Sequence, residues 1–263
     1  MAESVVQAQG LYCAHGWRYV VRDVSFQIET GEIAVIVGVN GVGKTTLLST
    51  IAGALSAAKG SISVFGHRRR QSAAAERLAR DLTLYLPDRH WLPPTMLVRE
   101  YLGSVGELFG LSRCEIIDQI NDLTDLFDLT SVGNHLLGTL STGQRKKVGL
   151  CTALMAPRRL LLLDEPFSGG LDPGGITALR RTLRHRAHKT GQTIVMTTPV
   201  PEFVTELADR LLVLKDGLLS HNLTREDLRK VAPDTEHMVD TLNSLIFPDV
   251  DSRIDRYLAG RTK

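Results

Sequence analysis

Apolar runs and amphipathic stretches alternate along most of this chain. The short runs "IAVIV", "LLLL" and "TIVM" are apolar at almost every position and are bounded by polar or turn-forming residues. Such runs are typical of strands that are buried on both faces. Between them, stretches such as "GGITALRRTLRHRAHK" place apolar residues at helical spacing. Helices that alternate with doubly buried strands predict an α/β domain with a mostly parallel sheet covered on both faces.

Further elements follow from the same pattern. "YVVRDVSFQI" (Tyr19 to Ile28) alternates as a half-exposed strand does, and "SISVFG", "LTLYLP" and "RLLVLKDGLL" also indicate strands. From Thr95 to Leu129 the apolar positions recur at helical spacing, which predicts a helical insertion. "TREDLRKVA" predicts a short helix capped by Thr224 in an otherwise polar tail.

Composition and length narrow the class of protein. The 263 residues fit one large domain, or one domain with an insertion. The net charge of +2 gives no support for a nucleic-acid partner, and none is expected. No secretory signal is expected, and no apolar run reaches the roughly 18 residues of a spanning helix. The three cysteines are far apart, which predicts reduced thiols in a cytoplasmic protein.

The strongest chemical signal is "GVNGVGKTT", which fits G-x-x-x-x-G-K-[ST] between a buried strand and a helix. Backbone N–H groups of such a loop surround a phosphate chain, and the amino end of the helix adds partial positive charge. Lys44 is expected to reach the β- and γ-phosphates, and the Thr45 hydroxyl to ligate Mg²⁺. The residues predicted to hold ATP are Gly38, Val39, Asn40, Gly41, Val42, Gly43, Lys44, Thr45 and Thr46.

A second signal is "LLLLDEP", in which a strand of leucines ends in two acids. A buried strand does not end in two charges without a reason. Asp164 is placed to hold the Mg²⁺ shell, and Glu165 to polarise an attacking water as a general base. The alternative, that both acids cap the next helix, is much weaker beside a phosphate loop.

A third signal is "LSTGQRKKVGL", a helix start with Ser141 as N-cap and glycine for close approach. In this order with the other two, it resembles the signature of the ATP-binding-cassette (ABC) family, over about residues 20 to 217. Leu140, Ser141, Gly143 and Gln144 match the family's Leu-Ser-Gly-Gly-Gln, and Thr142 replaces one glycine.

The resemblance implies a P-loop NTPase (RecA-like) fold with a parallel-sheet core, an antiparallel β subdomain and a helical insertion. The ABC domain would cover residues 1–217, with its helical subdomain at about 88–157, and a C-terminal extension would cover 218–263. In the family, a serine and amides of the signature complete the ATP site of a second subunit. A homodimer or heterodimer is therefore expected, with Ser141, Gly143 and Gln144 acting across the interface. Asp172 resembles the family's cross-dimer aspartate, on a loop that Gly169 and Gly170 lengthen by a residue.

The family also has an aromatic residue that stacks on adenine about two dozen residues before the phosphate loop. This spacing falls on His15, and Trp17 and Tyr12 nearby offer flat faces too. The alternative for each is an ordinary strand residue.

Two positions depart from the family pattern. Asp88 stands where a Mg²⁺-touching glutamine is usual; an acid there resembles the exporter-type (ABC-2) branch and can accept a Mg²⁺-bound water. Pro199 stands where a histidine contacts the γ-phosphate. Losing one such donor typically costs on the order of a hundredfold in rate. The chain is therefore a slow ATPase, or one half of an asymmetric dimer, or a switch that binds ATP without hydrolysis.

The leading hypothesis is the ATP-hydrolysing subunit of an ABC transporter, preferably an exporter, on the inner face of the cytoplasmic membrane. It would drive a separate permease, which the apolar segment Asp88 to Tyr101, with Trp91, is expected to contact. The alternatives are a soluble ABC ATPase acting on ribosomes or nucleic acid and a regulatory subunit without catalysis. "GHRRRQ" is interpreted as a solvated basic loop, and Arg145, Lys146 and Lys147 as solvent-facing or near phosphate.

Overall fold

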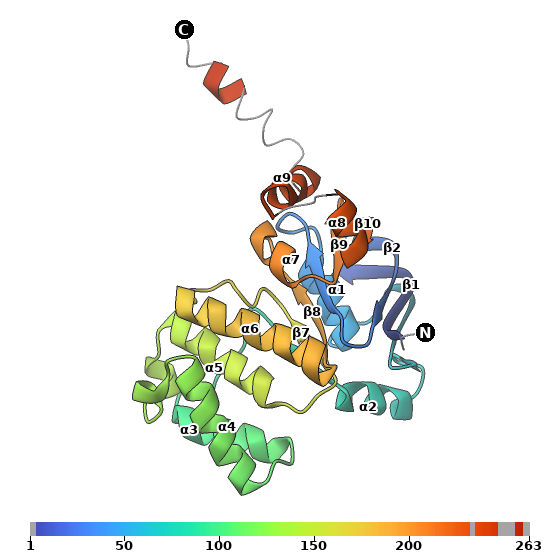
Figure 1. Cartoon of the computed structure of the whole chain (residues 1–263). Coiled ribbons are helices and arrows are strands. Elements are labelled where there is room, and N and C mark those ends of the chain that lie inside the picture. Colours follow the sequence, from blue (N-terminus) through green and yellow to red (C-terminus); the bar gives the residue numbers. More distant parts are fainter. Residues whose placement is uncertain (1–3, 232–234, 247–255, 260–263) are drawn as a thin grey trace.

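Two β-sheets of different construction form the framework of the protein. The computed structural model describes residues 4–231, 235–246 and 256–259 (Figure 1). Within that part of the chain, one sheet has six strands in the order β10-β9-β3-β8-β7-β6. Its strands are β3 (Ile33–Val37), β6 (Thr83–Leu86), β7 (Leu160–Leu163), β8 (Thr193–Thr197), β9 (Arg210–Lys215) and β10 (Leu218–Thr224). All neighbours pair in parallel except β10, which runs antiparallel to β9.

The apolar runs of the sequence become the centre of this sheet. Every residue of β3, β7 and β8 is buried, as expected for strands covered on both faces. The predicted α/β class with a mostly parallel sheet is confirmed.

The smaller sheet is antiparallel and has the order β2-β1-β4-β5 within the described residues. Its strands are β1 (Ser4–His15), β2 (Arg18–Glu29), β4 (Lys59–Val64) and β5 (His67–Arg68). The hydrophobic pattern does not predict β1, because shifts in its pairing with β2 near Gly10 break the alternation of apolar residues. Gly10 has a φ of +51°, which suits glycine at such an irregularity.

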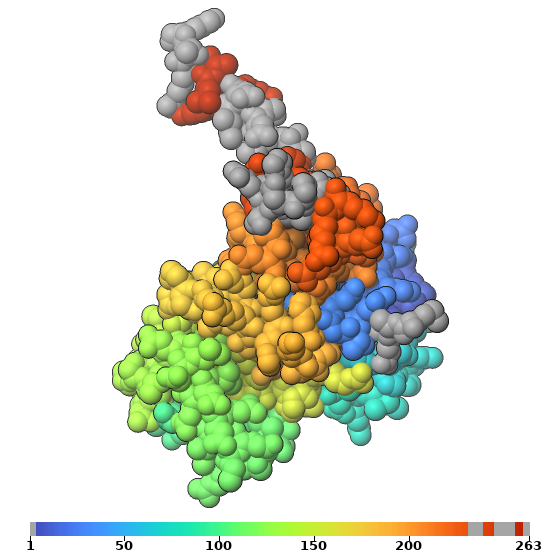
Figure 2. Space-filling model, viewed as in Figure 1, coloured from blue at the N-terminus to red at the C-terminus, as the bar shows by residue number. Residues whose placement is uncertain are grey.

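Helices cover both sheets. Helix α1 (Lys44–Ala52) contacts strands of both sheets and buries Leu47, Leu48 and Ile51 between them. The predicted helical insertion is present as α3 (Val98–Leu108) and α4 (Arg113–Leu126), which pack against α5 (Thr142–Met155). In the space-filling view this green insertion forms a lobe beside the yellow helix α6 (Figure 2). The other labelled helices are α2 (Ala73–Asp81), α6 (Pro173–Thr190), α7 (Pro201–Leu207), α8 (Arg225–Val231) and α9 (Thr235–Ile246), with short 3₁₀ turns η1 (Thr130–Val132) and η2 (Leu137–Thr139). Residues 256–259 are also helical.

The segment assigned to the C-terminal extension begins inside the core sheet. β10 pairs with β9 along its length, so residues 218–224 continue the sheet rather than a separate tail. Thr224 then caps α8 as predicted, because its hydroxyl accepts from the Asp227 amide while the Asp227 carboxylate accepts from the Thr224 amide. Farther along, α9 lies against α7 and buries Leu242, and part of the remaining extension lies outside the described residues.

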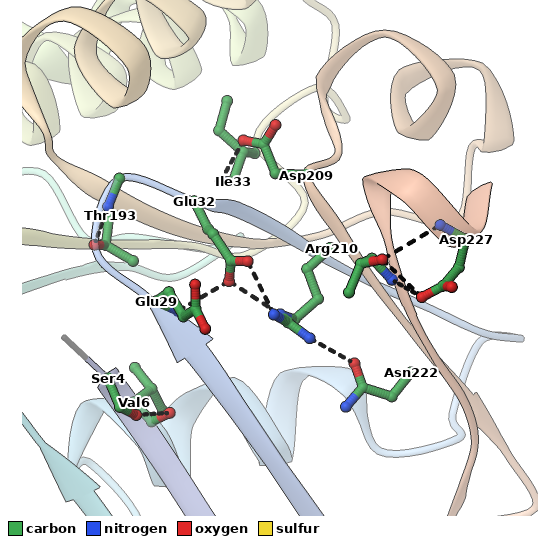
Figure 3. Close-up of polar contacts among 12 residues, drawn as sticks. Ser4, Val6, Glu29, Glu32, Ile33, Thr193, Asp209, Arg210, Asn222 and Asp227 are labelled. Atoms are coloured by element: carbon green, nitrogen blue, oxygen red, sulfur yellow. Dashed lines mark hydrogen bonds and ion pairs between the residues drawn. The ribbon is translucent and has the colours of Figure 1, made fainter. Parts of the chain in front are cut away.

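A polar network closes the amino edge of the six-stranded sheet (Figure 3). Arg210 makes two hydrogen bonds to Glu32, at 3.0 and 2.9 Å, and a third to Asn222 at 3.2 Å. Asp209 accepts from the Ile33 amide at 3.0 Å. These groups tie the starts of β3 and β9 together at the edge opposite the phosphate loop, so the chemistry is expected at the other edge.

The basic segment "GHRRRQ" is not a solvated loop throughout. Arg69 is 8% exposed, donates to the Ile51 carbonyl at 3.1 Å and forms an ion pair with Glu76 at 3.1 Å. Burial forces this guanidinium to take protein partners, so the expectation of a solvated loop is wrong for Arg69. The three cysteines Cys13, Cys114 and Cys151 lie within the described chain and form no disulfide.

Candidate nucleotide site

The carboxyl ends of four parallel strands bring most of the predicted site residues to one edge of the sheet. Gly38 follows β3, the Asp164–Glu165 pair follows β7, Asp88 follows β6, and Pro199 follows β8. Because β3, β8, β7 and β6 are neighbours in that order, these four segments lie side by side. The carboxyl edge of a parallel sheet is the usual ligand-binding position in α/β proteins.

The phosphate loop has the backbone that its glycines require. Gly41 and Gly43 have φ values of +83° and +112°, a region in which other residues are strained. Helix α1 begins at Lys44, and its N-cap Gly43 provides no side-chain hydrogen bond. The first amides of α1 therefore remain available to an anion, which is the property a phosphate site needs.

Lys44 is folded over this loop. Its side-chain ammonium donates to the Gly38 carbonyl at 2.9 Å and to the Val39 carbonyl at 3.3 Å. The residue is only 5% exposed. Burial lowers the pKa of Lys44, while the charges of Glu165 and Asp164 act in the opposite direction. The ammonium is thus held at the loop, beside two carboxylates.

Asp164 is bound by hydroxyl groups from two sides. Its Oδ1 accepts from Thr45 at 3.1 Å and from Thr197 at 2.6 Å, and the residue is 2% exposed. The predicted pair Thr45 and Asp164 is therefore in contact. Thr197, at the end of β8, is a site residue that the sequence reasoning missed. The available signal was the "TT" that ends a buried strand beside the acidic pair.

Glu165 has an unusual backbone conformation. Its φ is +45°, which is rare for a residue with a side chain. The Glu165 amide donates to the Thr197 hydroxyl at 2.9 Å, and this hydrogen bond stabilises the backbone conformation at the amide of Glu165. Burial raises the pKa of the Glu165 carboxyl, with Lys44 opposing the rise and Asp88 and Asp164 adding to it. A carboxylate with a raised pKa is a better proton acceptor, as a general base requires.

The donor set fits Mg²⁺ bound together with a nucleotide. Among the described residues, no three His, Cys, Asp or Glu side chains converge as a complete metal cluster. Mg²⁺ commonly takes one or two carboxylates together with waters and substrate phosphates, so a full protein cage is not required. Thr45 and Asp164, already in contact at 3.1 Å, are the residues that would hold it.

Asp88, whose contact with Mg²⁺ remains a prediction, has two partners within the protein. Its Oδ1 accepts from the Lys146 ammonium at 3.1 Å and from the Ser168 hydroxyl at 3.1 Å. Lys146 and Lys147 are 4% and 6% exposed, so the expectation that they face solvent is wrong. Each lysine is paired with an aspartate, Lys146 with Asp88 and Lys147 with Asp172, and a position near phosphate remains a prediction.

The signature residues occupy the amino end of α5. Ser141 is the N-cap and forms a capping box with Gln144, in which the Ser141 hydroxyl accepts from the Gln144 amide at 3.2 Å. This geometry confirms the predicted cap and leaves the hydroxyl hydrogen free to donate. A Cβ on Gly143 would meet the Gly170 carbonyl at 2.5 Å, so glycine is needed there for the loop to approach.

Asp172 is the N-cap of α6. Its Oδ1 accepts from the Gly175 amide at 2.7 Å, and its Oδ2 accepts from Lys147. The hydrogen bond from Lys147 lowers the pKa of Asp172, so the carboxylate is charged near neutral pH. Asp172 remains half exposed, and its role toward a second subunit remains a prediction.

Two of the candidates for adenine stacking, His15 and Trp17, lie at the tip of the β1–β2 hairpin, and Tyr12 lies within β1. His15 is exposed, and Trp17 is 96% exposed. Tyr12 packs edge-on against Tyr19, with ring centroids 5.6 Å apart. Neither His15 nor Trp17 lines the neighbouring cavity of about 510 Å³, to which Tyr19 contributes. The residues that line it are Arg18, Tyr19, Val20, Arg22, Val39, Asn40, Gly41, Val42, Asp216 and Gly217.

Pro199 lies two residues after the end of β8 at Thr197, and α7 begins two residues later with Pro201 at its first position. His188 precedes β8 in the sequence and His221 follows it, and both side chains lie away from this position. His188 contacts Asp209 at 2.9 Å, and Asp209 is bonded to the start of β3 at the opposite edge of the sheet. His221 lies on the edge strand β10 and contacts Ser220. The position after β8 is thus left without an imidazole from these residues.

We expect Thr197→Val to destabilise the protein by about 1–3 kcal/mol, because it leaves the Glu165 amide without its acceptor. Thr197→Ser keeps the hydroxyl and is the matched control. Chemical denaturation of both variants measures the free energy of unfolding. Equal stability of the valine and serine variants would show that the hydroxyl contributes nothing.

A glycine-rich loop between β3 and α1, with an acidic pair after the parallel strand β7, defines a P-loop NTPase fold. Residues 21–168 match the sequence profile described as "ABC transporter", and this chain belongs to the ABC transporter family. It is 35% identical over 212 residues to "Nod factor export ATP-binding protein I" of Rhizobium johnstonii, covering 81% of this chain and 67% of that protein.

Two other comparisons place the chain within the family. It is 34% identical over 217 residues to "Sulfate/thiosulfate import ATP-binding protein CysA 1" of Agrobacterium fabrum, covering 79% of this chain and 60% of that protein. A solved structure described as "Structure of ATP binding subunit of ABC transporter" superposes with a TM-score of 0.77 at 26% identity, covering 86% of this chain and 92% of that one. Relatives named for export and for import are therefore both similar to this chain.

Proposed function

We propose that this chain is the ATP-binding and ATP-hydrolysing subunit of a membrane transporter whose permease is a separate chain. The observation that carries the proposal is the contact of Thr45 with Asp164, which joins the phosphate loop to the acidic pair at one edge of the sheet. None of the helices in the described ranges is long and apolar enough to cross a membrane. A permease of another chain would provide the passage.

Each residue of the site would have a distinct task. The loop amides and Lys44 would bind the phosphates, and Thr45 and Asp164 would hold Mg²⁺, which would offset phosphate charge. Glu165 accepts a proton from the attacking water. Two sets of contacts support this assignment. Lys44 donates to a loop carbonyl, and the Thr197 hydroxyl contacts the Asp164 carboxylate and the Glu165 amide.

We propose that two ATP-binding subunits act together, as a homodimer or a heterodimer. The start of α5 is exposed or half exposed at Ser141, Gly143 and Gln144, and the Ser141 hydroxyl can still donate a hydrogen bond. Such a helix start suits a phosphate bound by the second subunit. Asp172, half exposed beside Gly170, would lie at the same interface.

The segment from Asp88 to Tyr101 is the proposed contact with the permease. Trp91 is 78% exposed on this segment, and exposed aromatic side chains are common at protein interfaces. Export is proposed over import only because the acid at position 88 resembles the exporter-type branch. The names of the relatives are compatible with either direction.

Vanadate-sensitive release of phosphate from MgATP tests the proposed activity, and co-sedimentation with membranes tests the partner. The transporter subunit is expected to show both. A soluble ABC ATPase acting on ribosomes or nucleic acid would hydrolyse ATP without following the membrane fraction. A regulatory subunit would bind ATP at the membrane without vanadate-sensitive turnover.

We expect Pro199→His to raise the turnover rate by about tenfold or more, because it adds a donor for developing phosphate charge. Pro199→Ala removes the same ring without adding a donor and is the matched control. Turnover at saturating MgATP measures the effect. If both variants hydrolyse ATP at the same rate, the position after β8 does not limit catalysis in this chain.

A further inference from the structure

A closed ring of polar contacts lies beside Glu165. The Lys146 ammonium donates to Asp88 Oδ1 at 3.1 Å and to the Glu165 carbonyl at 2.9 Å. The Ser168 hydroxyl contacts the same two oxygens, at 3.1 and 2.8 Å. A hydroxyl has one hydrogen and an ammonium has three, so only Lys146 can serve both acceptors at once. The ring therefore depends on the lysine.

Lys146 is built into the protein rather than placed on a solvated face. Its side chain is 4% exposed, whereas that of Asp88 is 40% exposed. A buried ammonium needs partners that compensate for lost hydration, and the ring provides two. Arg145, the preceding residue, is exposed and donates to the Gly138 carbonyl instead. The two adjacent cations of α5 thus have different environments.

The ring joins three segments that are far apart in the sequence. Lys146 comes from the first turns of α5, Asp88 follows β6, and Glu165 and Ser168 follow β7. Glu165 has a left-handed backbone, a conformation that persists only where its surroundings hold it. Thr197 holds its amide, and Lys146 and the Ser168 hydroxyl and amide hold its carbonyl.

We infer that Lys146 is a positioning residue for ATP hydrolysis, which fixes the peptide of Glu165, and that Asp88 is the counter-ion of Lys146. The inference rests on the proposed function for its kinetic consequence. It assigns to Asp88 the role of counter-ion in place of the predicted metal contact, because Asp88 Oδ1 accepts from both Lys146 and Ser168. It also connects the signature helix to the catalytic turn within one subunit.

The test compares Lys146→Met, Lys146→Arg and the matched control Arg145→Met. For Lys146→Met we expect kcat to fall about tenfold or more, because Glu165 would no longer be held in the orientation that catalysis requires. The KM for MgATP should change less than twofold, since the phosphate loop is intact. Lys146→Arg should recover most of the activity, and Arg145→Met should match the unaltered protein. Equal kcat in the two methionine variants, or a rise in KM that accounts for the loss, would overturn the inference.

Hydrogen exchange separates this inference from the proposed function. The Ser168 amide donates to the Glu165 carbonyl at 3.1 Å, so its exchange reports on the turn without any catalysis. We expect faster exchange in Lys146→Met than in Arg145→Met. Unchanged exchange would overturn the positioning role, even if no form of the protein hydrolyses ATP. If Lys146→Met shows faster exchange but no form of the protein hydrolyses ATP, the result would count against the proposed ATPase activity and not against the positioning role.

Asp88→Asn removes the ion pair with Lys146 by changing its more exposed partner. This variant replaces Lys146→Met in the test if Lys146→Met does not fold. A lower kcat with an unchanged Mg²⁺ requirement is the expected result. In the double variant Asp88→Asn/Lys146→Met, the loss should be no larger than for Lys146→Met, because both residues act through one contact. A higher Mg²⁺ requirement in Asp88→Asn would assign Asp88 to the metal and overturn its role as counter-ion.

Discussion

Replacing Glu165 by glutamine is expected to reduce ATP turnover by about 10²- to 10⁴-fold, the usual contribution of a general base. The amide keeps the size of the side chain but cannot accept the proton. Binding of MgATP should persist, because Lys44 and the loop amides are unaffected. The ATP-bound dimer should then accumulate, and its mass in gel filtration with MgATP measures this.

The pH dependence of ATP turnover gives a second measurement of the role of Glu165. Burial raises the pKa of Glu165, so its carboxylate becomes protonated at a higher pH than an ordinary glutamate does. Activity should therefore fall on acidification sooner than an ordinary carboxyl would cause. Glu107→Gln, at an exposed position on α3, is the matched control and should leave turnover unchanged. Similar rates for the two glutamine variants would remove Glu165 from the mechanism.

Replacing Lys44 by alanine is expected to weaken MgATP binding by about 10- to 100-fold. The ammonium is 5% exposed and held at the phosphate loop, so its loss removes charge-assisted hydrogen bonds worth about 1.5–3 kcal/mol. Turnover at cellular ATP concentrations should fall with occupancy. Equilibrium binding of a fluorescent ATP analogue measures the affinity.

Lys189→Ala removes an exposed lysine near the end of α6 and controls for the change in net charge. It should bind ATP as the unaltered protein does. Tight ATP binding by Lys44→Ala would mean that the loop amides alone account for affinity, and it would move the role of Lys44 to the transition state.

The parts of the site that follow one another in the sequence could be predicted from it. Apolar runs identified β3, β7 and β8, because a strand buried on both faces has a local pattern. The phosphate loop and the acidic pair are likewise contiguous, so spacing alone defined them. Their assembly at one sheet edge followed from the parallel topology.

The contacts between distant segments could not be predicted in the same way. Lys146 lies in the polar run "RKK", and its burial depends on Asp88 and Glu165, which are brought to it by two strands. The sequence around Thr197 indicates only the end of a strand, and its role depends on contacts with Asp164 and Glu165 that the fold creates. A helix such as α5, buried at six successive positions from 146 to 151, has no apolar periodicity to reveal which cation is inside.

The phosphate loop at Gly38–Thr46 and the acid Glu165 are expected to hydrolyse ATP together. Phosphate release from MgATP, measured for the unaltered chain and Glu165→Gln at equal nucleotide occupancy and with membranes present, tests it most directly. Vanadate-sensitive release is expected from the unaltered chain, with at least about a hundredfold less from the variant. Equal release from both at full occupancy would contradict it.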